Sequence, residues 1–285
     1  MLILLGAGPY SRSRGGSHPS IPPWCLELLT SARADKSDAN FSMRLRAVDR
    51  SASATAMLLP FGEDIWIADG PTTAVAGFRY PTRMAIVRLP GNALFIWSPI
   101  TLSDELRTAI DALGEVRFLI APNSLHHLFL GEWRTAYPTA KLYAPPGLRT
   151  RRKDLQFEGD LGDVPAPEWS EHIDQVVMAP NLITTEVVFF HRKSRTAIFT
   201  DLIQHFDASA FTGWRAIVAR LDLMVGPEAA VPRKFRAAFI DRRAARAAIQ
   251  RILAWPTHGV LMAHATPVQS DGQAFLRRAF QWLKP

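Results

Sequence analysis

Histidine and aspartate residues follow three apolar segments of this chain, at points where strands are expected to end. They are His126 and His127 after the run 117–120, Asp201 after the run 196–199, and His264 after the run 260–263. Strand ends at one edge of a sheet are where α/β proteins assemble sites from distant parts of the sequence. Imidazole and carboxylate ligands together suit Zn, Fe or Mn, and such ions activate water for hydrolysis. The sequence therefore predicts a metal site at these strand ends.

The same segments offer further polar side chains. Asn123 precedes the histidine pair, and His205 lies four residues beyond Asp201. We predict that Asn123 and His205 line the pocket. Asp201 is also the catalytic candidate, because it, or a hydroxide held by the metal, would serve the attack on a carbonyl or phosphorus centre.

Each candidate also has a purely structural explanation. A histidine pair after a strand is often a hydrogen-bonded feature of its loop, and His264 can be a core histidine with a satisfied ring. Asp201 can be the N-cap of a helix beginning at Leu202, and His205 would then share its helical face and orient it. The histidines predicted to lie at the surface or in a polar loop, outside the site, are His172, His191 and His258.

The elements that would position these residues alternate between strands and helices. Two apolar runs, 84–89 and 93–97, are joined by Pro-Gly-Asn and predict a β-hairpin. Ser103 then predicts the N-cap of a helix that ends at Gly114. The buried strand 117–120 follows, stops at Pro122 and leads into the loop that carries the two histidines.

The second half of the chain repeats these signals. The runs 186–190 and 196–199 flank a short polar turn and predict a second hairpin. Residues 207–240 carry mixed helical signals, which we interpret as short helices and a cap-like loop. Asp241 predicts the N-cap of a helix packed on the core, and residues 272–283 predict a closing helix with one apolar face.

Length and composition exclude several classes of protein. A chain of 285 residues, 48% of them hydrophobic, can bury a substantial core. Cys25 is the only cysteine, which excludes an intramolecular disulfide and a cysteine-rich zinc site and fits a reducing cytoplasm. No stretch reaches the ~18 apolar residues of a spanning helix, and residues 1–5 are too short for a signal-peptide core. We therefore expect a cytoplasmic protein without a transmembrane segment.

Residues 1–56 differ in texture from the rest of the chain. They are rich in Ser, Arg, Ala and Gly, and their seven basic and four acidic residues supply +3 of the net charge of +7. We predict a disordered basic extension here and a single domain over residues 57–285. A translation start at Met43 or Met57 would make the extension an artefact, and an Arg-rich targeting peptide is a second alternative.

Several motifs together resemble a known fold family. They are Gly62-Glu63-Asp64-Ile65-Trp66, Asp69-Gly70-Pro71, Ala121-Pro122-Asn123 with His126-His127, and Trp133. In the observed order of hairpin, helix, strand and histidine loop, they resemble an uncharacterised bacterial branch of the metallo-β-lactamase fold that carries only a domain-of-unknown-function label. The resemblance covers residues 57–285 and implies an α/β fold, the four-layer αββα sandwich.

The family's metal-binding motif is altered in this chain. The loop motif His-x-His-x-Asp-His would fall on residues 123–128, with Asn123 and Leu125 in place of the first two histidines and His127 on the aspartate. A shift by one residue would place His127 on the last histidine instead. Asn181 falls near the next histidine of the family, so the resemblance implies that Asn181 lines the pocket. Asp201 and His264 match the bridging aspartate and the final histidine. The resemblance thus implies three or four ligands, enough for one metal ion or for none.

Two classes of function follow from these observations. The strand-end residues favour a metal-dependent hydrolase that acts on a small ester, thioester, amide or phosphoester and holds one Zn, Fe or Mn ion. Asn123 and Asn181 favour a metal-free binding module or pseudoenzyme that keeps the pocket, because Asn hydrogen-bonds a polar ligand but is a poor zinc ligand. Basic clusters at 149–153 and 233–236 suggest nucleic-acid binding as a third function. No RNA-recognition or helix-turn-helix signature accompanies these clusters, so we do not expect nucleic-acid binding.

Overall fold

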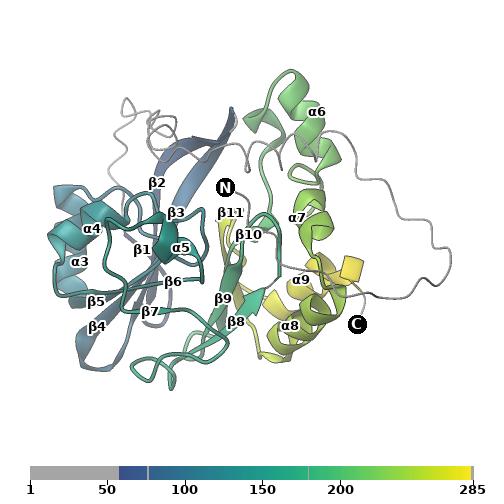
Figure 1. The fold of residues 1–285 in the computed structure, drawn as a ribbon. Coiled ribbons are helices and arrows are strands. Elements are labelled where there is room, and N and C mark those ends of the chain that lie inside the picture. The colour runs from purple at the N-terminus through teal and green to yellow at the C-terminus, as the bar shows by residue number, and fades with distance from the viewer. Residues whose placement is uncertain (1–57, 76, 179, 284–285) are drawn as a thin grey trace, which may run out of the picture. The chain divides into compact units, whose positions relative to one another are not determined.

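The computed structural model describes residues 58–75, 77–178 and 180–283, so the predicted extension 1–56 lies outside the described residues. Within these ranges the chain forms two β-sheets with helices on their outer faces (Figure 1). The seven-stranded sheet runs in chain order through β1 (Leu59–Gly62), β2 (Ile65–Val75), β3 (Phe78–Arg88), β4 (Ala93–Trp97), β5 (Glu115–Ile120), β6 (Lys141–Ala144) and β7 (Gly159–Asp160). The four-stranded sheet has the order β11 (Gly259–His264), β10 (Thr196–Gln204), β9 (Glu186–His191) and β8 (Ile173–Met178).

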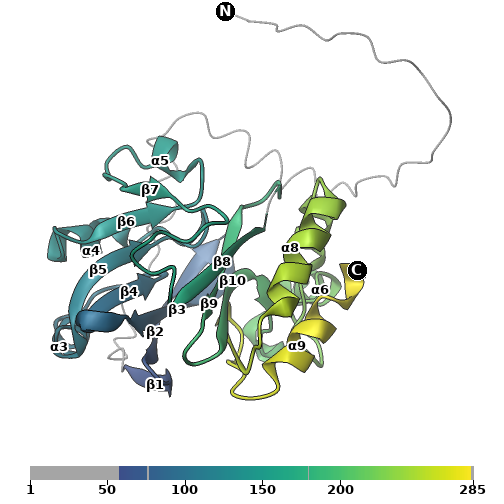
Figure 2. The same ribbon diagram turned by 90° about the horizontal axis from the view of Figure 1, so that it is seen from below.

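The helices divide into two groups by the sheet they accompany. The described helices are α3 (Asp104–Leu113), α4 (Leu130–Ala136), α5 (Leu148–Arg151), α6 (Trp214–Leu221), α7 (Arg233–Ala238), α8 (Arg242–Ala254) and α9 (Gly272–Ala279). Helices α3 and α4 cover the seven-stranded sheet, and α8 and α9 cover the four-stranded sheet (Figure 2). None of the helices within the described ranges combines the length and apolarity that a membrane crossing needs.

Three layers of buried side chains hold this four-layer αββα arrangement together. Strand β4 shows how the sequence builds them, since side chains alternate between the two faces of a strand. Leu94 and Ile96 point to the layer under α3, whereas Phe95 and Trp97 point to the layer between the two sheets. All four are fully buried, which explains why the run is apolar at every position. The fold class predicted from the sequence is therefore confirmed.

The local signals in the first half are confirmed residue by residue. Strands β3 and β4 pair antiparallel across the Pro-Gly-Asn turn, in which Gly91 takes a φ of 71° that favours glycine. The Ser103 side chain accepts a hydrogen bond from Leu106 N, as an N-cap does. Helix α3 ends before Gly114, where an added Cβ would lie 2.1 Å from Asn92 O. Glycine is therefore required at this close approach of two backbones.

Three expectations for the second half need correction. Asp201 does not cap a helix, because β10 continues through it to Gln204. The closing helix α9 ends at Ala279, and a short 3-10 turn over Gln281–Leu283 follows it. His191 is not at the surface but only 2% exposed, because it ends β9 and its Nδ1 lies 2.8 Å from Ser194 Oγ. The prediction of an N-cap at Asp241 is confirmed by its hydrogen bonds from Arg243 N and Ala244 N.

Candidate metal centre

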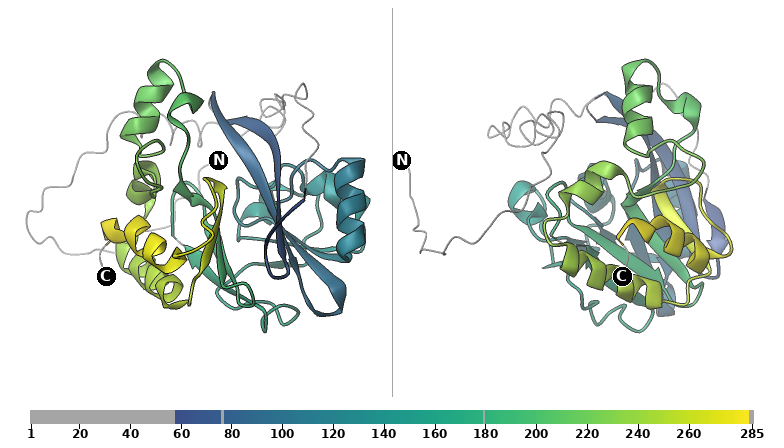
Figure 3. Two further views of the ribbon diagram at one scale, coloured as in Figure 1. Left: turned by 180° about the vertical axis from the view of Figure 1, so that it is seen from behind. Right: turned by 90° about the vertical axis from the view of Figure 1, so that its right-hand side faces the viewer.

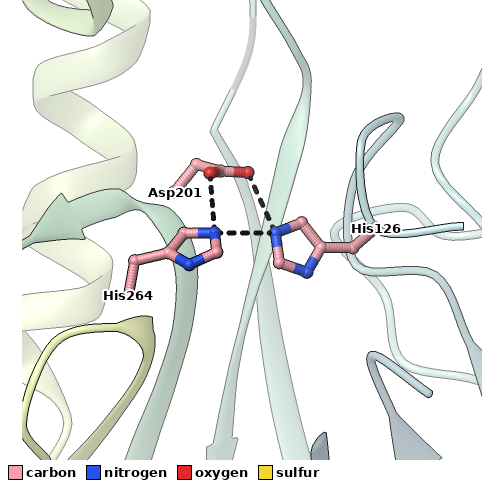
Figure 4. A group of neighbouring side chains, drawn as sticks. All are labelled: His126, Asp201 and His264. Atoms are coloured by element: carbon pink, nitrogen blue, oxygen red, sulfur yellow. Dashed lines mark hydrogen bonds and ion pairs between the residues drawn. The ribbon is translucent and has the colours of Figure 1, made fainter. Parts of the chain in front are cut away.

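Three side chains from distant parts of the chain meet at the ends of β5, β10 and β11. They are His126 from the loop after β5, Asp201 within β10, and His264 at the end of β11 (Figure 4). Nε2 of His126 lies 3.3 Å from Asp201 Oδ2, and Nε2 of His264 lies 3.3 Å from Asp201 Oδ1. The two Nε2 atoms are themselves 3.3 Å apart. The side chains of all three residues are at most 10% exposed, and His126 is the most exposed of them.

The hydrogen bond at the far side of His264 decides how its ring is protonated. Nδ1 lies 2.9 Å from Pro81 O, and because a carbonyl oxygen only accepts, Nδ1 carries the proton. Burial lowers the pKa of His264 against the opposing effect of Asp201, so the ring is neutral near pH 7. Its Nε2 lone pair then faces a carboxylate oxygen at 3.3 Å. Two acceptors at this distance need a proton or a metal ion between them.

The separations fit a small divalent ion. Bonds of about 2.0–2.1 Å in tetrahedral geometry put neighbouring ligand atoms about 3.3 Å apart, which is the spacing found along each side of the cluster. The two sides that reach Asp201 end on different oxygens, and a carboxylate can bind an ion through one or both. The carboxamide oxygen of Gln204, beside Asp201, is buried without a hydrogen-bond partner among the described residues. Two imidazoles and a carboxylate are a suitable donor set for Zn, Fe or Mn.

Asp201 is held as an anion. Burial alone would raise its pKa, but the neighbouring His126 outweighs burial and holds the pKa well below the ordinary value. Asn123 adds a hydrogen bond from Nδ2 to Asp201 Oδ2 at 2.6 Å. Its Oδ1 accepts from the backbone N–H groups of Leu125 and His126, which fixes the turn that carries the histidine. Asn123 therefore anchors both Asp201 and the His126 loop.

Ser98 holds the other end of the His126 ring. It follows the last residue of β4, and its Oγ lies 2.8 Å from His126 Nδ1. Its φ of 52° is unusual for a residue that is not glycine, and it is 3% exposed. Strain of this kind is found at sites where a side chain must point in one direction. An outer partner on the second ring nitrogen is also what metal-binding histidines normally have.

The strand that carries Asp201 departs from regular pairing. Between the register pairs Phe199–Met262 and Gln204–His264, β10 advances five residues while β11 advances two. The buried Glu186 carboxylate accepts hydrogen bonds from the backbone N–H groups of the bulge, at Thr200, Asp201 and Leu202. Burial and the neighbouring Asp201 charge raise the pKa of Glu186 to about 7. Glu186 therefore replaces the missing strand partner at the point where Asp201 turns toward the histidines.

The remaining predicted site residues lie elsewhere. His127 points away from the cluster, and Arg152 Nη1 donates to its Nδ1 at 3.0 Å. Burial, and secondly Arg152, lower the pKa of His127 to about 4. Asn181 donates to Phe235 O and accepts from Ile183 N, and His205 Nε2 lies 2.9 Å from Gly226 O. The cluster therefore brings together His126, Asp201 and His264, with Asn123, and leaves the other three out.

Sequence reasoning missed Ser98, Glu186 and Gln204. Ser98 stands directly after the apolar run 93–97, so the same strand-end rule that found Asp201 and His264 would have found it. Glu186 opens an apolar strand with a carboxylate, which is a signal of a buried charge with a specific partner. Gln204 has no comparable signal, because a glutamine after a strand is common at the surface.

Comparison with known proteins places the chain in a family. The profile described as Domain of unknown function (DUF4336) matches residues 62–216, more than half of the chain. The chain belongs to the DUF4336 family. His126 and Asp201 of this DUF4336 protein lie within the matched range, whereas His264 lies beyond it. No curated protein matches the sequence.

Solved structures similar to this DUF4336 protein share the metallo-β-lactamase fold. A metallo-β-lactamase from Pontibacter korlensis is 12% identical with a TM-score of 0.55, over 80% of this chain and 99% of that one. The FIM-1 metallo-β-lactamase of Pseudomonas aeruginosa, in its mono-zinc form, is 10% identical with a TM-score of 0.53, over 81% and 97%. The metal-soaked Flv1 flavodiiron core of Synechocystis sp. PCC6803 is 12% identical with a TM-score of 0.54, and the match spans 80% of this chain and only 60% of that one. At these identities the likeness establishes the fold alone.

Proposed function

We propose that this protein is a metal-dependent hydrolase that holds a single Zn, Fe or Mn ion between His126, Asp201 and His264 and acts on a small ester, thioester, amide or phosphoester. The observation that carries the proposal is the geometry of His264, whose Nδ1 lies 2.9 Å from Pro81 O while its Nε2 lies 3.3 Å from the Asp201 carboxylate. A buried anion beside a lone pair is costly unless a cation lies between them.

The residues of the chain divide the work of such a site. An ion bound here would polarise a carbonyl or phosphoryl oxygen and lower the pKa of a water molecule. Asp201 would supply the negative charge that holds the ion, and it would also accept the proton of an attacking water molecule. Ser98 and Pro81 orient the two imidazoles through their Nδ1 atoms. The low exposure of the three ligands limits the access of bulk water.

Three protein ligands leave positions on the ion for water and substrate, which is the usual difference between catalytic and structural zinc sites.

A metal-free binding module has less support. Its motivation was that Asn123 and Asn181 would bind a polar ligand, but both amides are engaged within the protein. The mono-zinc form of FIM-1 metallo-β-lactamase shows that a related fold can bind one ion, and we extend this to the present chain only as part of the proposal.

Elemental analysis of full-length protein, purified without a polyhistidine tag, tests the metal. We expect about one equivalent of a transition metal, lost in His264→Ala and kept in the matched variant His258→Ala, whose histidine is exposed. Less than about 0.2 equivalents in wild type after incubation with Zn, Fe and Mn in turn would contradict the proposal.

Turnover tests the reaction separately. The metal-loaded protein is offered a 4-nitrophenyl ester, an acyl thioester, an anilide and a phosphodiester, and release of the leaving group is followed. Hydrolysis of one class that chelation abolishes and added metal restores is the expected result. Stoichiometric metal with no turnover of any class would retain the metal site and reject the hydrolase.

A further inference from the structure

Helix α6 (Trp214–Leu221) carries an apolar stripe that the other described elements leave largely exposed. Trp214, Ile217, Val218 and Leu221 occupy positions i, i+3, i+4 and i+7, which form one face of a helix. Their exposed fractions are 58%, 62%, 36% and 60%. On the opposite side, Ala219 is fully buried in a small cluster with Phe206, Phe211 and Met224. The helix therefore has its packed side satisfied and a second apolar side open to solvent.

The stripe continues onto the hairpin of β2 and β3. The Phe78 ring contacts the Trp214 ring edge-on, with centroids 5.9 Å apart. Val75, which pairs with Phe78 across the hairpin, is 49% exposed. Figure 3 shows α6 standing at the end of this hairpin, apart from α8 and α9. Residues from two elements thus extend one apolar surface, which exceeds what isolated surface side chains produce.

The charged residues of α6 itself are both arginines. Arg215 and Arg220 flank the stripe on α6, with the Arg215 guanidinium 4.7 Å from the Trp214 ring centre. Arg233 reaches the end of the helix, where its Nη1 donates to Leu221 O. The sequence has no acidic residue between positions 208 and 221. Asp222, which follows, is 5% exposed and is paired with Lys234 at 3.2 Å.

We propose that α6 and the β2–β3 hairpin form a docking surface for an anionic phospholipid bilayer. An apolar face with tryptophan at its edge and arginines beside it is the pattern of helices that lie in the membrane interface. Arginines there approach lipid phosphates while their stems follow the apolar surface. A second copy of the chain seated on the same face would bring arginines of like charge together, which favours the lipid surface over self-association.

Vesicle flotation of the full-length protein tests this surface. The double variant Ile217→Glu/Leu221→Glu is compared with Val164→Glu/Leu182→Glu, which makes the same charge change at two other exposed apolar residues. All proteins keep the basic residues 1–56, so their contribution cancels between the variants. We expect wild type and the control to bind phosphatidylglycerol vesicles at low salt. The affinity of the α6 variant for these vesicles should be lower by a factor of about ten or more. Binding to phosphatidylcholine vesicles should be weak for all three.

Several results would overturn the proposal. Wild type that does not float with anionic vesicles at low salt rejects it, as do equal losses in both double variants. A dimer of wild type in light scattering that the α6 variant alone dissociates, with vesicle binding unchanged, assigns the surface to a second copy of the chain. Circular dichroism and metal content of the α6 variant should match wild type, because the changed side chains are exposed and lie outside the metal cluster.

Discussion

Both imidazoles of the cluster have their Nδ1 atoms engaged by the protein, and this leaves both Nε2 atoms to face Asp201. Pro81 O determines the tautomer of His264, because a carbonyl cannot donate. Ser98 Oγ can donate or accept, so His126 has the freedom that His264 lacks. An ion at the Nε2 side would require Nδ1–H on His126 and therefore an accepting hydroxyl at Ser98.

Replacing Ser98 by Ala tests this outer hydrogen bond. The His126 ring would lose its partner 2.8 Å away, and loss of such a partner commonly lowers metal affinity by about 10–100-fold. Competition with a chromophoric chelator measures the change. Ser124→Ala is the matched control, since Ser124 lies on the same loop and contacts Thr184 rather than the cluster. If Ser98→Ala abolished turnover with unchanged metal affinity, Ser98 would act on the substrate and its positioning role would be rejected.

His191 gives a pH dependence that is independent of the metal. Burial, partly opposed by Asp64, lowers its pKa from 6.5 to about 4. Between pH 6.5 and about 4, His191 binds a proton in the unfolded chain but not in the folded chain. The contribution of neutral His191 to the unfolding free energy is therefore complete above pH 6.5 and is lost as the pH falls to about 4. The loss amounts to about 3 kcal/mol. Urea unfolding at pH 7 and pH 4.5 should show a smaller loss of stability for His191→Gln than for wild type, and equal losses would contradict the assignment.

At the scale of elements, the site depends on a distortion of β10 and on the carboxylate that fills it. Glu186 accepts three backbone hydrogen bonds from the bulge, so Asp201 keeps its direction without a regular strand neighbour. Bulges next to sites commonly serve to aim one side chain. A carboxylate shared by three N–H groups is also a compact way to satisfy donors that the irregular pairing exposes.

Glu186→Ala should therefore affect both folding and metal binding. Three buried N–H groups lose their acceptor, and each costs about 1–3 kcal/mol, so we expect at least about 3 kcal/mol less unfolding free energy. Metal affinity should also fall at temperatures where the variant is fully folded. Glu171→Ala, at an exposed position, should change stability by less than about 0.5 kcal/mol. Normal metal affinity in a folded Glu186→Ala protein would contradict the positioning role.

Helices and strands were predictable from the sequence where a residue acts through local geometry, as at a helix cap or a tight turn. Ser103, the Pro-Gly-Asn turn and Asp241 identified two helix starts and a hairpin because capping and turn geometry act over three or four residues. The bulge was not predictable in this way. Asp201 followed by apolar residues satisfies an N-cap pattern, and only the pairing of β10 with β11 and the distant Glu186 decides for a strand.

The candidate site was predictable in part for the same reason. The strand-end rule identified His126, Asp201 and His264, since parallel strands bring their ends to one edge. The strand-end rule could not tell which of His126 and His127 joins the cluster. That choice depends on the turn that Asn123 fixes through its bond to His126 N, and on Arg152, which bonds the His127 ring. Asn181 was expected in the pocket from the family pattern, but its amide binds the backbone near α7.

At the scale of the whole fold, the cluster joins the two sheets. His126 comes from the loop after β5 of the seven-stranded sheet, whereas Asp201 and His264 belong to the four-stranded sheet. Arg83 makes a second link nearby, since its Nη1 donates to Met262 O and Ala265 O from β3. An ion held by the three ligands would therefore oppose separation of the sheets and would bind the folded chain far better than the unfolded one.

Metal should consequently raise the melting temperature, and only through the cluster. An ion that binds the folded chain alone adds about 2.7 kcal/mol at a free concentration 100 times its dissociation constant. For a domain of this size that corresponds to about 5–10 °C. Thermal unfolding of wild type, His126→Ala and His258→Ala, each with and without added metal, measures the shift. Because His126 is the one proposed ligand from the seven-stranded sheet, its loss should remove most of the shift, whereas His258→Ala should keep it. Equal shifts of the melting temperature in all three proteins would show that the metal binds elsewhere. The proposed centre would then not contribute to holding the two sheets together.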